Sequence, residues 1–166
     1  PLWLKRKCFD YFVKKIPPTR FSVLVGNIHS LKKKNVIAVG KALRIAVYIV
    51  LKVGMNRTGI PPGNDAIELY KACERSQSVE IKGLHAYDGH IRTSNIDERT
   101  IECEKAFEAV LTMQSHLFEL GFNEPIIIAG GSPTFPIHAK KEKRECSPGT
   151  FIYWDRGYES AFAEQH

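Results

Sequence analysis

Apolar runs rich in β-branched residues alternate along the chain with segments of helical spacing. Residues 21–25, 43–53, 81–87 and 126–129 predict four strands, and residues 150–154 predict a fifth. The second run is rich in Ile and Val on both faces, which is typical of a buried parallel strand. A regular alternation of strand and helix indicates βαβ units and a parallel sheet.

Helical spacing connects these runs. Residues 28–39 and 65–75 predict helices, and the opening segment 2–16 predicts an amphipathic helix that two prolines end. The longest helix is predicted from residue 96 or 97 to residue 120, with Gly121 as its C-cap.

The chain is long enough for one domain, 1–166, and contains no low-complexity linker. Five strands cannot close an eight-stranded barrel, which needs at least about 200 residues. The pattern therefore leaves two architectures open: an open doubly wound sheet, or a barrel with pieces missing. The chain begins at Pro1 without an initiator methionine, which suggests a processed or incomplete polypeptide.

The net charge is +6, and the excess of Lys and Arg lies in short clusters. A nucleic-acid binder would need these clusters on one face with interleaved aromatic residues, but they fall on separate predicted helices, so nucleic-acid binding is a distant alternative. No apolar run approaches the about 18 residues that span a bilayer. The four cysteines form no CxxC pair and indicate neither a zinc site nor a disulfide framework, so we expect a cytoplasmic protein.

The segment GMNRTGI, Gly54 to Ile60, follows the second predicted strand and places Arg57 in a glycine-rich turn. At the carboxyl end of a parallel strand, such a turn holds a fixed positive charge where α/β barrels keep their chemistry. The alternative is a tight turn with a solvated arginine.

The third predicted strand ends in GLHAYDGH, residues 83–90. Alternation places His85 and Tyr87 on one face of this strand. Asp88 and His90 fall on the other face or in the following loop. Polar groups at the end of a buried strand are costly unless they form hydrogen bonds or bind a ligand. The segment therefore indicates either a binding site or a satisfied polar network.

Two small turns lie near the last two predicted strands: residues 130–134 (GGSPT) after the fourth, and residues 147–150 (SPGT) before the fifth. Backbone N–H groups and hydroxyls in such turns hold a phosphate without a lysine. Either turn alone is a weak signal, but two on neighbouring strands would make one phosphate cup. No GxSxG, HExxH or P-loop pattern occurs, and lone histidines such as His138 are interpreted as surface or packing residues.

In the order GMNRTGI, GLHAYDGH, AGGSPT and ECSPGTFIYWD, these motifs resemble the fold-type III pyridoxal-phosphate enzymes. Within them they are most similar to the branch of D-threonine aldolase and D-serine dehydratase, whose barrel is of the alanine racemase N-terminal type. The resemblance covers the chain from about residue 20 to residue 158. It implies an incomplete (β/α)8 TIM-type barrel with parallel strands, lacking the first strand or strands and the C-terminal β-domain.

The resemblance also implies roles for single residues. Arg57 would reach the ring of pyridoxal 5′-phosphate and its substituents. Tyr87 would pack against the pyridine face, with His85 and His90 nearby as proton-handling catalytic candidates. The cofactor's phosphate would be bound by the two turns, at Gly130, Gly131, Ser132, Thr134, Gly149 and Thr150.

The chain departs from the family pattern at three places. The family attaches its cofactor to a lysine at the end of the first barrel strand, and no lysine here stands in a comparable motif. The divalent metal of the aldolase and dehydratase branch is bound by a C-terminal domain, so we assign no metal ligand in this chain. Lys52 stands where the family commonly has an acidic or amide residue, and it places a like charge near Arg57.

By resemblance, we expect a lyase that cleaves a β-hydroxy-D-amino acid by a retro-aldol reaction, with little or no activity for these 166 residues alone. Alternatives are an amino-acid racemase or D-serine dehydratase of the same fold, and a non-catalytic pyridoxal-phosphate homeostasis barrel. The expected partner is a small D-amino acid rather than nucleic acid or a membrane. The family commonly builds its sites across a homodimer.

Overall fold

The computed structural model describes residues 20–39, 44–150, 156–162 and 164. In this part of the chain, one parallel sheet has the order β1-β2-β3-β4-β5: β1 (Ser22–Val25), β2 (Ile45–Leu51), β3 (Val79–Ala86), β4 (Ile126–Ala129) and β5 (Arg144–Cys146). The helices are α2 (Ile28–Val39), α3 (Asn64–Glu74), α4 (Ile96–Glu119), α5 (Phe135–His138) and α6 (Arg156–Ala161), and a 3₁₀ turn, η1 (Ser132–Thr134), directly precedes α5.

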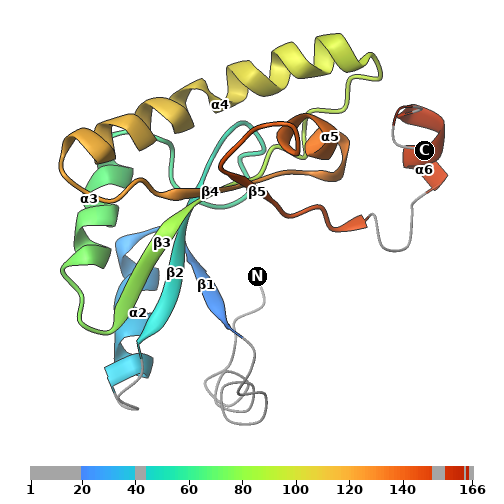
Figure 1. Ribbon diagram of the computed structural model, residues 1–166. Helices are drawn as coiled ribbons and strands as arrows, with labels where there is room; N and C mark the ends of the chain where they lie inside the picture. The colour runs from blue at the N-terminus through green and yellow to red at the C-terminus, as the bar shows by residue number, and fades with distance from the viewer. Residues whose placement is uncertain (1–19, 40–43, 151–155, 163, 165–166) are drawn as a thin grey trace.

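The strand order decides between the two architectures. A doubly wound sheet reverses its winding at a switch point and carries helices on both faces. Here each strand pairs with the next one along the chain, and right-handed crossovers then place the connecting helices on one face. In Figure 1, α2, α3 and α4 follow the same outer side of the sheet. The sheet is therefore an arc of a parallel α/β barrel, which confirms the incomplete barrel and rules out the open doubly wound sheet.

The two faces of the sheet have different neighbours. In β2, the odd-numbered residues from Ile45 to Leu51 are buried, whereas the even-numbered ones are half-buried. The buried side belongs to one core with helix residues such as Phe107 and Leu117 of α4. The other side is the barrel interior, where Leu24 and Ile126 keep 50% and 38% of their surface exposed. The described strands thus present a covered outer face and an open inner face.

Most predicted elements are confirmed. Strand 126–129 and helix 28–39 have the predicted bounds, and α3 and α4 start and end within one residue of theirs. The side chain of Asn95 caps α4 by accepting hydrogen bonds from the backbone N–H groups of Asp97 and Glu98, at 2.9 and 3.0 Å. Beyond its end, Gly121 has a φ of 87°, as predicted for a C-terminal glycine. The predicted helix at 2–16 lies outside the described residues.

The fifth strand of the described sheet was not predicted, and of the strand predicted at 150–154 only Thr150 lies within the described residues. The strand that pairs with β4 is Arg144–Cys146, with Ile127 opposite Arg144, and Thr150 lies outside any strand. Residues 151–155 are outside the described part. Three residues with two charged side chains give no strand signal in a sequence, because here pairing with β4 rather than local propensity forms the strand. The turn at 147–150 directly follows β5.

Among the described residues, no helix combines the length and apolar character that crossing a bilayer requires.

Candidate functional site

The carboxyl ends of parallel strands meet at one edge of a sheet. The segments after β2, β3, β4 and β5 therefore share one rim of the barrel arc. These segments are residues 52–60, 87–90, 130–134 and 147–150, which include every site residue predicted outside the strands. The position of β5 matters here, because it brings the second glycine turn to the same rim as the first.

The loop after β2 is closed at its base. The N–H of Ile60 donates to the carbonyl of Val50, and the N–H of Lys52 donates to the carbonyl of Ile60, both at 2.9 Å. Gly59 has a φ of 103°, and a Cβ atom there would lie 2.6 Å from the Val50 oxygen. Only glycine fits this backbone, so the loop returns tightly to its strand and holds Arg57 at a defined place on the rim.

Arg57 and Tyr87 lie together. The guanidinium carbon of Arg57 is 5.2 Å from the centre of the Tyr87 ring, within the range of a cation–π contact. The Tyr87 ring lies against the backbone of Gly89, and the imidazole of His90 lies directly over the Cα of Gly54. The loops after β2 and β3 therefore contact each other through site residues that were predicted from the sequence.

A cavity of about 100 Å³ opens beside these residues. It is lined by Leu24, Val50, Leu51, Lys52, Val53, Met55, Asn56, Arg57, Thr58, His85 and Tyr87. Ligand pockets usually enclose about 300–1,000 Å³. The smaller volume is consistent with an arc of barrel, which supplies one wall of a site.

His85 lies on the inner face of β3, opposite Val50 of β2 and Ile128 of β4. Its Nδ1 atom is buried and has no hydrogen-bond partner. Burial lowers the pKa of His85 from its ordinary value, and a backbone hydrogen bond opposes this only in part. A neutral imidazole therefore lines the cavity, while its Nδ1 is buried within the protein.

The two small turns are joined by Ser132 and Thr150. The Ser132 Oγ accepts hydrogen bonds from the Thr150 hydroxyl at 2.5 Å and from the Thr150 backbone N–H at 3.3 Å. The N–H of Ser147 donates to the carbonyl of Ala129, which ties the second turn to the end of β4. The turns thus form one continuous surface, while Gly149 is exposed and has open space around its Cα.

Thr134 faces inward. Its side chain is fully buried, and its hydroxyl donates to Asp88 Oδ1 at 2.7 Å. The hydroxyl oxygen of Thr134 accepts a hydrogen bond from the N–H of Gly131 at 3.2 Å. The hydroxyl of Thr134 and the N–H of Gly131 are therefore engaged within the protein, and both groups fix the shape of the turn rather than face a ligand.

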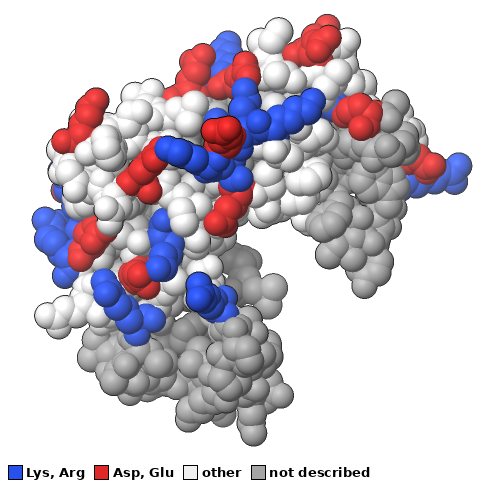
Figure 2. Space-filling model, viewed as in Figure 1, with Lys and Arg blue, Asp and Glu red and all other residues white. Residues whose placement is uncertain are grey.

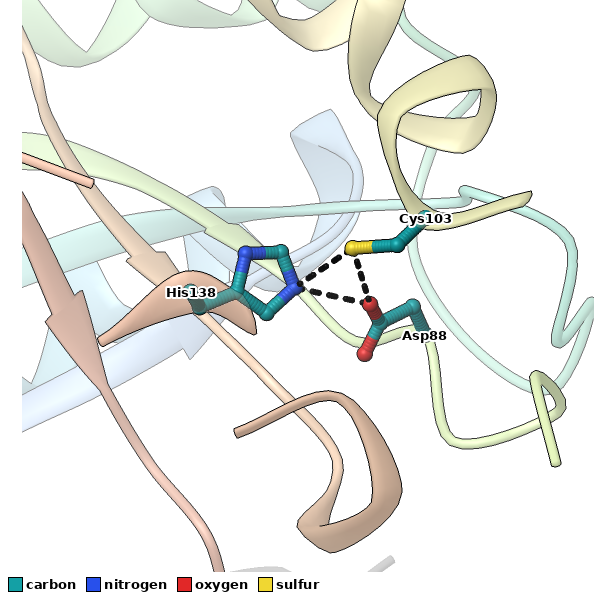
Figure 3. Close-up of side chains that lie close together, drawn as sticks. All are labelled: Asp88, Cys103 and His138. Atoms are coloured by element: carbon teal, nitrogen blue, oxygen red, sulfur yellow. Dashed lines mark hydrogen bonds and ion pairs between the residues drawn. The ribbon is translucent and has the colours of Figure 1, made fainter. Parts of the chain in front are cut away.

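Asp88, Cys103 and His138 form a buried cluster between the loop after β3, α4 and α5 (Figure 3). His138 Nε2 lies 2.8 Å from Asp88 Oδ2 and 3.4 Å from Cys103 Sγ. Burial alone would raise the pKa of Asp88, but hydrogen bonds from His138 and Thr134 outweigh it and hold that pKa below its ordinary value. The cluster was missed by sequence reasoning, because its members are far apart in the chain and His138 was interpreted as a surface or packing residue.

The cluster can also be tested as a metal site. Arg144 lies 3.0 Å from His138 Nδ1, and a guanidinium can only donate, so the imidazole proton is on Nε2, which faces Asp88. Burial and the neighbouring Asp88 raise the pKa of Cys103 to about 12, so its sulfur is a thiol. A metal ion would need the lone pair of Nε2 and a thiolate. As arranged, the cluster is a proton-bearing hydrogen-bond network, and it supports the rim from the helix side.

A family model described as "Alanine racemase, N-terminal domain" matches residues 10–157. A parallel barrel arc with its polar residues at the carboxyl rim defines an α/β-barrel protein. The chain belongs to the alanine racemase N-terminal-domain family, the barrel of the fold-type III pyridoxal-phosphate enzymes.

Three solved structures illustrate the likeness. D-threonine aldolase from Filomicrobium marinum has a TM-score of 0.82 at 22% identity, over 93% of this chain and 42% of that chain. Alanine racemase from Clostridium difficile 630 has a TM-score of 0.74 at 15% identity, over 97% of this chain and 42% of that chain. D-threo-3-hydroxyaspartate dehydratase from Delftia sp. HT23 has a TM-score of 0.75 at 12% identity, over 95% of this chain and 42% of that chain. These identities show a shared fold, and the chain spans 42% of the length of each. No curated protein sequence matches the chain significantly.

Proposed function

We propose that this chain forms the cofactor-binding rim of a pyridoxal-phosphate lyase that cleaves a β-hydroxy-D-amino acid by a retro-aldol reaction. The observation that carries the proposal is the meeting of three kinds of group on one rim. A cation over an aromatic ring, at Arg57 and Tyr87, lies next to a glycine turn that Ser132 and Thr150 complete. Such a set is complementary to a phosphorylated aromatic ligand.

The residues present fit pyridoxal phosphate. Gly131 and Gly89 touch closely, and Gly89 also lies under the Tyr87 ring, so the phosphate turn and the ring site are adjacent. The imidazole of His85, whose pKa is lowered by burial, lines the same cavity and supplies a polar group beside the ligand. We assign the ring to Tyr87 and Arg57, and the phosphate to Ser132, Gly149 and Thr150. Gly130, Gly131 and Thr134 hold the turn, since the N–H of Gly130 donates to the carbonyl of Ala86 at 3.2 Å.

When bound, pyridoxal phosphate supplies an electron sink for the bond that is broken at the substrate's Cα. The chain's residues bind and orient around it. Arg57 places a permanent positive charge at the mouth of the cavity, and Tyr87 fixes the plane of the ring. His85 lines the cavity and burial lowers its pKa, so the neutral imidazole can accept a proton from the substrate hydroxyl, the role of a general base in this reaction. His90, which lies over Gly54 at the rim, is the second proton-handling candidate.

Binding of pyridoxal phosphate tests the proposal directly. Equilibrium dialysis with the wild-type chain is expected to show saturable binding, and Arg57→Gln or Ser132→Ala is expected to weaken it about tenfold, because each removes a hydrogen bond to a charged group. The matched control is Lys71→Gln, which changes an exposed lysine on α3 paired with Glu68. Equal affinity in all four proteins would contradict the proposal.

A second assay addresses the reaction. The chain lacks a lysine in a comparable cofactor motif, so we expect no release of aldehyde from D-threonine by these residues alone. Aldehyde released at a rate that His85→Gln abolishes would contradict this expectation and would locate the base.

A further inference from the structure

The rim cavity contains two cationic side chains and no acidic one. Lys52 and Arg57 both line it, and none of its lining residues is Asp or Glu. Asp88, the acid nearest in sequence to the lining residues His85 and Tyr87, turns both oxygens away, toward Thr134 and His138. The cavity is therefore electropositive by construction, and a ligand that carries negative charge is needed to balance it.

Some other lysines in the described part of the chain are neutralised locally. Four described lysines form ion pairs: Lys71 with Glu68, Lys82 with Glu80, Lys141 with Glu104, and Lys143 with Glu124. On the face shown in Figure 2, basic and acidic side chains are accordingly interspersed. Within the described residues, Lys52 and Arg57 have no such acidic partner. Exposed Lys32, Lys105 and Lys140 form no such pair in that part of the chain either, whereas Lys52 is half-buried and lines a cavity beside a second cation.

The backbone explains why Lys52 reaches this place. It continues the half-buried, even-numbered side of β2, directly after Val50, which faces the barrel interior opposite His85. Its own N–H holds the base of the loop through Ile60, so its Cα is fixed. Arg57 comes from the same closed loop. One rigid segment therefore supplies both cations to one cavity.

We propose that Lys52 and Arg57 form a two-cation site that selects a ligand with two carboxylates, so that the substrate is an acidic amino acid with a carboxylate on its side chain. Calling this ligand a substrate rests on the proposed function, but the binding selectivity itself does not require a cofactor. Every amino acid has one carboxylate, which one cation can bind. The second cation is left beside a like charge unless the side chain brings a second negative charge.

The test compares a dicarboxylate with a monocarboxylate on the chain without cofactor. Succinate and acetate are titrated at low salt and followed by two-dimensional NMR, with shifts expected in residues 52–59. We expect succinate to bind at least about tenfold more tightly than acetate, because it gains a second charge-assisted hydrogen bond. Lys52→Gln should remove this preference by weakening succinate alone, whereas Lys52→Arg should keep it and Lys71→Gln should leave both affinities unchanged.

Three results would overturn the inference: equal affinities in the wild-type chain, a preference that survives Lys52→Gln, or shifts confined to residues 130–134. The outcome is separable from that of the proposed function. Succinate selectivity without pyridoxal-phosphate binding would leave the two-cation site standing and end the cofactor proposal, and the reverse result would do the opposite.

Discussion

At the scale of single residues, His85 has the most informative surroundings. Its side chain lies on the inner face of β3, its Nδ1 is buried without a partner, and burial lowers its pKa below the ordinary 6.5. A buried polar atom without a partner costs free energy, and proteins retain such atoms chiefly where they function. His85 is therefore expected to cost stability in the unliganded chain, and to do so in a pH-dependent way.

The pH dependence has a definite sign. Below 6.5 the unfolded chain protonates His85, whereas the folded chain resists protonation until its lowered pKa is reached. Unfolding then takes up a proton, so the free energy of unfolding should fall as the pH falls below 6.5, by at most about 1.4 kcal/mol per pH unit. Urea unfolding measured from about pH 5 to about pH 7, the range in which the slope is expected, tests this prediction. His85→Gln should flatten it, and the matched change at exposed His116 should not; an unchanged slope in His85→Gln would refute the assignment.

At the scale of elements, the sequence predicted what local pattern controls. Strand 126–129 is a run of Ile bounded by Pro125 and a glycine pair, and it was predicted to the residue. β5 could not be predicted in the same way, because its three residues form a strand only through pairing with β4. The buried face of α4 also contains a residue that an apolar pattern does not indicate. Arg99 is fully buried there: its two terminal nitrogens bond the carbonyls of residues 93 and 94 and the Glu164 carboxylate, and its guanidinium lies over the Phe162 ring, while its Nε has no partner in the described part of the chain.

The residues of the candidate site show the same difference between local patterns and long-range contacts. Arg57, Tyr87 and the two glycine turns were predictable, because each occupies a short motif at a strand end. The network that supports them was not, because Asp88, Cys103 and His138 meet only once α4 and α5 have packed on the sheet. Long-range contacts of this kind leave no signal in a single sequence.

That network links the loop after β3 to α5, and Asp88→Asn tests the link. One amide oxygen can serve Thr134 or His138 but not both, and the amide NH₂ would then oppose a hydroxyl proton or the Nε2 proton that Arg144 fixes. We expect a loss of about 1–3 kcal/mol in the free energy of unfolding. Urea denaturation measures it, with Asp65→Asn in the exposed first turn of α3 as control, where the loss should stay below about 1 kcal/mol. Equal losses would show that the network contributes nothing special.

At the scale of the whole molecule, the chain is an arc of barrel whose inner face is open. The strands at both edges of the described sheet, β1 and β5, each have one neighbour. Leu24 and Ile126 expose apolar surface on the inner side. Exposed apolar faces and unpaired strand edges both promote association. The predicted homodimer and the predicted cytoplasmic location remain predictions.

Self-association through the open face is expected for the isolated chain. Leu24→Lys places a charge on that face and should raise the monomer fraction in sedimentation velocity at a given concentration. Ile101→Lys is the control, since Ile101 is 67% exposed on α4, on the outer side of the barrel. A larger effect from Ile101→Lys would show that association uses the helix side instead.

Gly89 and Gly131 meet so closely that a Cβ atom on Gly131 would lie 2.7 Å from the Gly89 Cα. Main chain therefore touches main chain between the place assigned to the aromatic ring and the place assigned to the phosphate. The distance between the ring site and the phosphate site is therefore set by backbone atoms, which, unlike side chains, have no alternative rotamers. Substituting the surrounding side chains can change the affinity for such a ligand, but the contact between the two backbones fixes the ligand length that fits.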